Sequence, residues 1–139
     1  MKQFLLSIFA LTFLAITTQA RSAEPEASSE LRDQAAKTMV EKHPNFLAIY
    51  TKGLVCNSCG IGLRIHIGKL DGVDKSQLSK GVELDVEKQL VLVAFKPYAA
   101  IDVDGVREAI YNAGYDPVHY YLWTEVGGIT QTVYHVSEK

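Results

Sequence analysis

The residues whose chemistry is easiest to name are two cysteines. Cys56 and Cys59 are the only cysteines of the 139-residue chain, and two residues separate them. Thiolates are the ligands that soft metal ions prefer, and two sulfurs suit ions that accept nearly linear, two-coordinate binding, such as Cu(I) and Hg(II). A structural zinc site normally needs four ligands, so Zn(II) and Cd(II) are weaker alternatives. The pair therefore predicts a site for a thiophilic metal, with Cu(I) the first choice.

The same spacing also occurs in proteins that do not bind metal. One alternative is a thiol-disulfide redox protein, with Cys56 as the nucleophile and Cys59 as the resolving thiol. Such enzymes usually place a cis-proline opposite the pair, and neither Pro97 nor Pro117 has the expected context of a strand beginning opposite the motif. A second alternative is an interaction domain with an inert disulfide, although so short a loop adds little stability. We do not expect an enzyme.

The cysteines lie between a predicted strand and a predicted helix. Residues 46–51 alternate between two faces, which predicts a strand that Gly53 ends. After Cys59 apolar residues recur at helical intervals, at Leu63, Ile67 and Leu70. Unpaired N–H groups and the positive end of a helix dipole stabilise thiolates at such a junction. Gly60, Gly62 and Gly68 each weaken this helix by up to ~1 kcal/mol.

The following segments complete a βαββαβ order. Residues 82–86 and 90–95 predict a hairpin around a polar turn. Asp102 can cap a second helix that ends at Gly114, and a final strand runs from Tyr115 to about Trp123, where Gly127-Gly128 closes it. The predicted fold is α+β: a ferredoxin-like sandwich with a four-stranded antiparallel sheet and two helices on one face.

The N-terminal segment predicts export, and the rest of the chain divides into a linker, a main domain and a tail. The apolar run from Phe4 to Ile16 is too short for a bilayer and is typical of a signal peptide (1–20), with cleavage expected after Ala20 and Ala23 as the second choice. Residues 21–45 are expected to be a linker with a short helix over 30–42, residues 46–123 the main domain, and residues 124–139 a tail that is an edge strand or disordered. We therefore expect a periplasmic or secreted protein with no membrane span after cleavage.

The net charge argues against a nucleic-acid partner, and the positions of the histidines argue against their being metal ligands. The formal net charge is −2 without a basic cluster, which argues against nucleic acid. His66 falls on the predicted core face beside Leu63 and Ile67, so we interpret it as a partly buried histidine rather than a metal ligand. His43, His119 and His135 are expected at the surface.

The run from Gly53 to Cys59 resembles a known family when it is combined with later residues of the chain. Together with Leu63, Ile67, Leu70, Asp71-Gly72-Val73, Ile110 and Ala113-Gly114-Tyr115, it is similar to the heavy-metal-associated domain. That family includes copper chaperones, metal-binding domains of copper-transporting ATPases and the periplasmic mercuric-ion-binding protein. The resemblance covers about residues 46–120.

The resemblance implies a metal carrier. Cys56 and Cys59 would hold the ion and pass it by ligand exchange to a membrane metal transporter or another metal-carrying protein. Tyr115 matches the loop residue that shields the metal, and Leu54 stands where the family usually has a Met that packs beneath the loop. The chain departs from the pattern at Asp74 to Gly81, which lengthen one connection, and in the glycines of the first helix.

Overall fold

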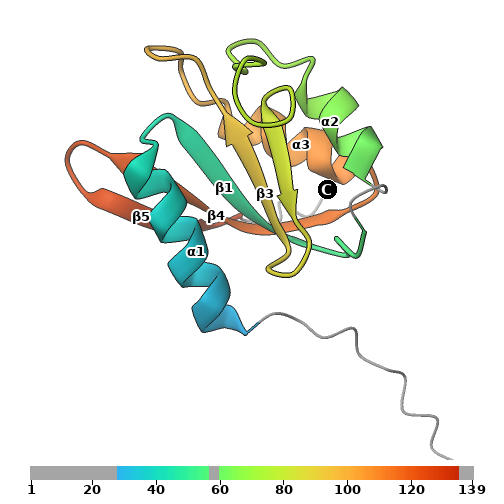
Figure 1. Ribbon diagram of the computed structural model, residues 1–139, viewed down its shortest axis with the longest axis horizontal. Helices are drawn as coiled ribbons and strands as arrows, with labels where there is room; N and C mark the ends of the chain where they lie inside the picture. The colour runs from blue at the N-terminus through green and yellow to red at the C-terminus, as the bar shows by residue number, and fades with distance from the viewer. Residues whose placement is uncertain (1–27, 57–59, 135–139) are drawn as a thin grey trace, which may run out of the picture.

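The computed structural model describes residues 28–56 and 60–134, and within these it contains three helices and one five-stranded antiparallel sheet (Figure 1). The elements are α1 (Ser29–Lys42), β1 (Phe46–Lys52), α2 (Ile61–Ile67), β2 (Val82–Asp85), β3 (Leu90–Ala94), α3 (Val103–Asn112), β4 (Asp116–Thr124) and β5 (Gly128–Val133). Neighbouring strands follow the order β2-β3-β1-β4-β5. No helix in the described part is long and apolar enough to cross a membrane. The predicted signal peptide lies outside the described residues.

The predicted βαββαβ order is confirmed for the central part of the chain, where β1, α2, β2, β3, α3 and β4 follow one another. The Asp102 carboxylate accepts a hydrogen bond from the Gly105 N–H at 2.9 Å, as a helix N-cap should. The hairpin also forms, with Leu84 of β2 opposite Val91 of β3. These elements were predictable because each carries its own periodicity and its own start or stop residue.

The predicted number of strands was wrong, because the sheet has a fifth strand. Gly127-Gly128 does not end the sheet but turns the chain back, so that Trp123 pairs with Ile129. The Thr124 hydroxyl accepts from the Gly127 N–H and donates to the Gly128 carbonyl, and Gly128 has a φ of 66°. A glycine at positive φ is typical of a tight hairpin turn, so the same residues fit a turn as well as a stop.

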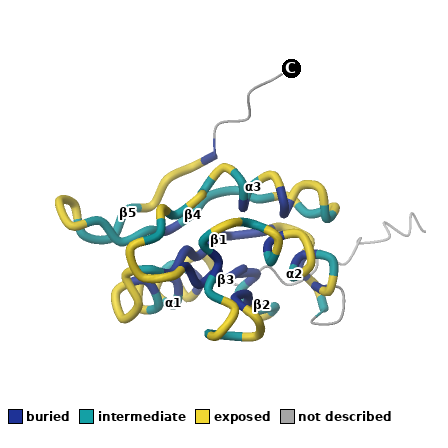
Figure 2. The backbone as a smooth tube through the Cα atoms, turned by 90° about the horizontal axis from the view of Figure 1, so that it is seen from above, coloured by how far each residue is buried: buried dark blue, intermediate teal, exposed yellow. Residues whose placement is uncertain are grey.

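The second difference is that helices cover both faces of the sheet. Alternate residues of β1 point to opposite sides: Leu47 and Ile49 join the core under α2 and α3, whereas Ala48 and Tyr50 join a second core under α1. Figure 2 shows buried positions along the strands between these layers. The predicted helix over 30–42 is therefore confirmed as α1, but it is a third layer of the domain rather than part of a linker.

A polar network attaches α1 to the sheet. Burial raises the pKa of the Tyr121 hydroxyl, which stays protonated and donates a hydrogen bond to Asp33 of α1. His119 Nε2 lies 2.8 Å from the same hydroxyl oxygen. The buried Arg32 guanidinium stacks 3.6 Å from the centre of the Tyr50 ring, which is a favourable cation–π geometry. His119 is thus half-buried and not the surface group that the sequence suggested.

His119 makes the stability of the fold depend on pH. Burial lowers its folded pKa below 6.5, the Arg32 charge lowers it further, and Asp33 opposes the shift only in part. The unfolded chain therefore binds the proton first, so stability should be complete above pH 6.5 and fall as the pH drops below that value. Urea unfolding at pH 7.5 and 5.5 should show this loss for the wild type and a smaller one for His119→Gln. Equal losses in both proteins would contradict the assignment.

The long connection that departs from the family pattern is ordered. Asp74 accepts hydrogen bonds from the Ser76 backbone and hydroxyl and from the Gln77 amide, and these bonds lower its pKa. Its own N–H donates to the Ala94 carbonyl, and the Ala94 N–H donates in turn to the Gly81 carbonyl. The segment is therefore attached to the end of β3.

Candidate metal site

Cys56 lies in the loop that follows β1. Gly53 ends the strand with a φ of +85°, a conformation that side chains other than glycine rarely adopt. Leu54 then turns inward and is fully buried in the core under α2 and α3, while Val55 is 48% exposed. Cys56 follows in a partly exposed position. Cys59, the second predicted ligand, lies outside the described residues.

Cys56 is disulfide-bonded in this structure. A sulfur in a disulfide carries no thiolate charge and cannot serve as a strong ligand for a soft metal. Any metal chemistry of this loop therefore requires reduction first. The redox state of the cysteines, which the sequence left open, becomes the variable that separates metal binding from redox or structural roles.

Tyr115 lies beside the same loop. α3 ends at Asn112, and Gly114, with a φ of +90°, turns the chain back toward β4. A Cβ atom placed on Gly53 would lie 3.8 Å from Tyr115 Cδ1, so the ring packs against the start of the loop. A shallow hollow opens there, lined by Lys52, Gly53, Tyr111, Gly114, Tyr115 and Asp116. The two predicted neighbours, Leu54 and Tyr115, are thus below and beside the loop that carries Cys56.

The helix after the cysteines is shorter than predicted. α2 begins at Ile61 and ends at Ile67, and the chain turns at Gly68 instead of continuing to Leu70.

One of the glycines that the sequence suggested would weaken this helix, Gly60, lies just before α2 and packs closely against β2. A Cβ atom on Gly60 would lie 1.7 Å from Leu84 Cδ1, so a larger residue there would force the Leu84 side chain to shift. Gly62 has more room, since its nearest neighbour would be the Ala113 Cβ at 4.0 Å.

These two glycines should respond in opposite ways to alanine. Gly60→Ala is expected to lower the free energy of unfolding by about 1–3 kcal/mol through overpacking against Leu84. Gly62→Ala is expected to raise it by up to ~1 kcal/mol, because it removes a helix-weakening glycine without a clash. Urea denaturation of both variants measures the difference. If the Leu84 contact causes the loss, Gly60→Ala should cost much less in a Leu84→Ala background, and an unchanged cost would contradict the packing explanation.

The surface position predicted for His43 is confirmed, whereas His66 was expected to be partly buried and is not. His66 is exposed, because the buried face of α2 consists of Leu63 and Ile67, one turn apart, and His66 projects beside it. His43 stacks on the Phe46 ring with 4.5 Å between centroids, and His135 lies outside the described residues. Within residues 28–56 and 60–134, no three His, Cys, Asp or Glu side chains gather where they could hold a metal ion.

A bulge in the sheet next to the loop was not predicted. β4 pairs Tyr50 with His119 but Thr51 with Pro117, so Val118 is an extra residue at the point where β1 leads toward Cys56. Proline has no N–H to give to a ladder, and bulges often redirect a strand near a functional loop. Pro117 therefore lies near the start of β4, opposite Thr51 of β1, and its peptide bond is trans.

No protein-family model and no curated protein matches this chain. Among solved structures, one titled CopZ metallochaperone aligns with a TM-score of 0.43 and 22% sequence identity, over 52% of this chain and 98% of that chain. A match this remote assigns neither a family nor a function. The resemblance to the heavy-metal-associated domain therefore rests on the cysteine motif and the residues around it.

Proposed function

We propose that the reduced protein binds one thiophilic metal ion, with Cu(I) preferred and Hg(II) as the other well-matched ion, through Cys56 and Cys59. The observation that carries this proposal is the position of Cys56: partly exposed, two residues after a fully buried Leu54, in the loop between β1 and α2. The buried leucine fixes the base of the loop, while the exposure gives an ion access. Two sulfurs match ions that bind with two ligands.

Transfer of the ion is part of the same proposal. A two-coordinate ion at a partly exposed loop can be attacked by the thiol of a partner, so that one sulfur replaces another and the total charge and ligand number are conserved. The receiving protein would be a membrane metal transporter or another metal carrier, and the exchange would take place outside the cytoplasm after removal of residues 1–20. We propose no catalytic reaction for the chain.

The redox state of Cys56 gives the direct test. Anaerobic titration of the reduced protein with Cu(I), in competition with a coloured chelator, should show one tightly bound ion per chain. The oxidised protein should not compete, because both sulfurs are then unavailable as thiolates. Equal competition by oxidised and reduced protein would place the metal elsewhere and contradict the proposal.

A second candidate function is a thiol-disulfide redox protein, and the disulfide of Cys56 favours it. The cis-proline that such enzymes usually place opposite the pair is absent from the described residues, since Pro117, which pairs with Thr51 of β1, has a trans peptide bond. In this function Cys56, once reduced, would attack the disulfide of a substrate protein and release one substrate thiol, and Cys59 would then resolve the mixed disulfide and release the second. The substrate would end as a dithiol and the Cys56–Cys59 pair as a disulfide, which an external thiol would reduce for the next cycle. Turnover in an insulin-reduction assay, lost in Cys56→Ser, would support this candidate, whereas no turnover together with Cu(I) binding would leave the metal carrier.

A further inference from the structure

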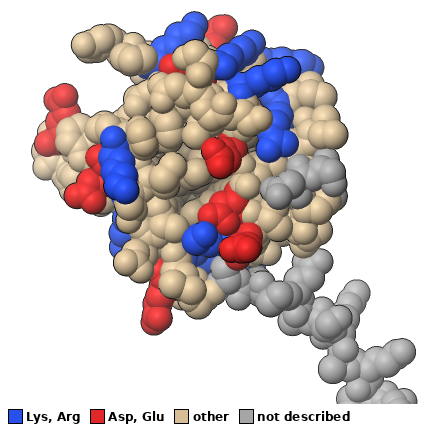
Figure 3. Space-filling view, in the orientation of Figure 1, with Lys and Arg blue, Asp and Glu red and all other residues tan. Residues whose placement is uncertain are grey.

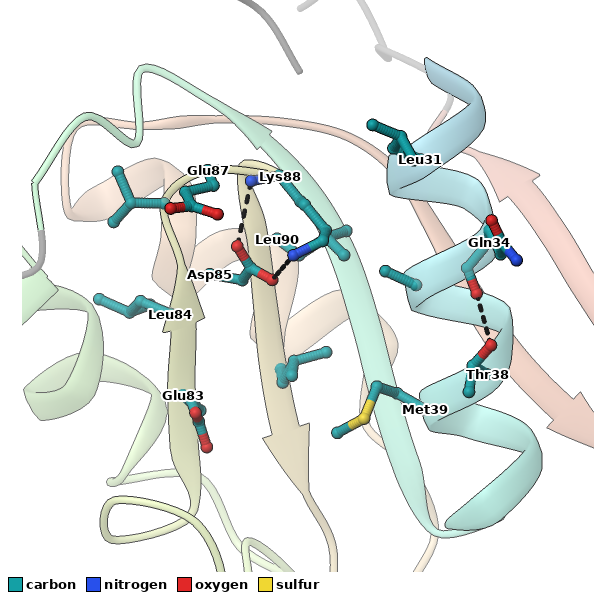
Figure 4. Close-up of a pocket in the computed structure, with 13 residues that line it drawn as sticks. Leu31, Gln34, Thr38, Met39, Glu83, Leu84, Asp85, Glu87, Lys88 and Leu90 are labelled. Atoms are coloured by element: carbon teal, nitrogen blue, oxygen red, sulfur yellow. Dashed lines mark hydrogen bonds and ion pairs between the residues drawn. The ribbon is translucent and has the colours of Figure 1, made fainter. Parts of the chain in front are cut away.

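A groove lies between α1 and the β2–β3 hairpin, on the face of the sheet opposite α2 and α3 (Figure 4). α1 packs over β1 and β4, so β2 and β3 extend beyond its edge. Leu90 and Leu92 of β3 lie in the groove, and their side chains belong to the core under α1. The groove therefore has an apolar floor.

The two walls of the groove differ in chemistry but share a repeat. On the helix side Leu31, Ala35 and Met39 follow one another at intervals of four residues, which places them about 6 Å apart along α1. On the hairpin side every second residue is acidic: Glu83 and Asp85 of β2, about 6.6 Å apart in an extended strand, and Glu87 in the turn that follows β2. In Figure 4 Leu31 and Glu87 lie toward one end of the groove, and Met39 and Glu83 toward the other.

The acidic wall carries a net negative charge, because its three carboxylates face one cation, Lys88. Lys88 forms an ion pair with Asp85 at 2.8 Å and also attracts Glu87, whereas Glu83 and Glu87 are exposed and form no ion pair with any residue that the structure describes. Figure 3 shows acidic side chains lined up near the middle of this face. On the apolar wall Leu31 is 60% exposed, so the groove combines open hydrophobic surface with open negative charge.

The acidic wall also argues against a second copy of this chain as the occupant. β2 pairs only with β3 within the described residues, so its outer edge could accept another strand. Two β2 edges that paired with each other would bring Glu83 and Asp85 of both copies together, and like charges on facing strands are destabilising. A basic occupant has the opposite preference.

We propose that this groove binds an extended segment of a partner protein in which Lys or Arg alternates with apolar residues. Successive side chains of an extended chain point to opposite sides, so the basic ones would face Glu83 and Glu87 while the apolar ones face Leu31, Ala35 and Met39. The apolar row spans about 12 Å along α1, which fits about five residues of extended chain. This inference goes beyond the proposed function and does not depend on bound metal.

The test uses a fluorescent seven-residue peptide of alternating Lys and Val, with a matched peptide in which Glu replaces Lys. Fluorescence anisotropy with the full chain at low salt should detect the Lys peptide and not the Glu peptide. The double variant Glu83→Lys/Glu87→Lys should bind the Lys peptide about tenfold more weakly or worse, because it reverses the charge of one wall. Glu108→Lys/Glu125→Lys, with the same charge change on α3 and on the β4–β5 turn, is the control and should bind as the wild type does.

Leu31→Ser tests the other wall. Its side chain is exposed, so the variant should fold normally by circular dichroism and still bind the Lys peptide severalfold more weakly. Equal binding of both peptides, or equal loss in the groove and control variants, would overturn the proposal. It would also be overturned if the full chain bound no peptide. In that case the groove would be filled by a second copy, shown by a dimer that the groove variant abolishes, or by another part of the same chain.

Discussion

Cys56→Ser is expected to lower the affinity of the reduced protein for Cu(I) by at least about a thousandfold, because a hydroxyl is a poor ligand for a soft ion and one thiolate cannot hold it alone. The affinity is read from competition with a coloured Cu(I) chelator under anaerobic conditions. The same substitution also removes the disulfide of Cys56, so the comparison is made with reduced wild-type protein.

Val55→Ser provides the matched control for this experiment. It introduces the same side chain one position earlier, at a residue that is 48% exposed and outside the core. We expect its Cu(I) affinity to stay within a few-fold of the wild type. If Val55→Ser and Cys56→Ser lose affinity equally, the loop conformation rather than the sulfur would be responsible, and the ligand assignment would be wrong.

Leu54→Ala is expected to lower the free energy of unfolding by about 2–5 kcal/mol, the usual cost of truncating a fully buried leucine. Leu54→Met nearly conserves the volume, so it should cost less than about 1.5 kcal/mol. Urea denaturation of the oxidised forms gives both values without a contribution from loop reduction.

The Leu54→Ala and Leu54→Met variants also test whether packing beneath the loop affects metal binding. Because Leu54 is the buried base of the loop that carries Cys56, the alanine variant should weaken Cu(I) binding at 25 °C even where it is still folded, whereas the methionine variant should bind as the wild type does. Two variants of equal stability, or a methionine variant that loses the metal, would show that the packing beneath this loop does not position the site.

The elements that were predictable from sequence are those with local signals. β1 alternates, the hairpin has a polar turn between two apolar runs, and α3 begins at a capping aspartate. The third layer was not predictable in the same way. α1 buries only Ala36 and Val40 fully in the core beneath it, and the contacts of Arg32 and Asp33 with Tyr50 and Tyr121, which are distant in sequence, add to this packing.

The candidate site was predictable in part for the same reason. The cysteine spacing and the residues on either side are local, so Leu54 and Tyr115 could be named from their positions in the motif. The packing role of Gly60 was not, because glycine weakens a helix in any sequence rule and only the approach of Leu84 shows why it is needed. Nor could sequence predict the groove, whose two walls come from residues 31–39 and 83–87.

The groove and the cysteine loop are connected through the hairpin. Leu84 lines the groove and also approaches Gly60 at the start of α2, and the Gln89 carbonyl accepts a hydrogen bond from the Thr51 N–H at the end of β1. A partner segment in the groove would therefore lie against the hairpin whose turn is hydrogen-bonded to the end of β1. This arrangement allows one partner to dock and to exchange metal, although either activity can be tested without the other.

The most direct test of the metal assignment is X-ray absorption at the copper edge, measured on the anaerobically reduced protein with one equivalent of Cu(I). We predict a two-coordinate copper with two sulfur neighbours, and a change in that first shell in Cys56→Ser. A first shell of nitrogen or oxygen, or a spectrum that Cys56→Ser leaves unchanged, would contradict the account.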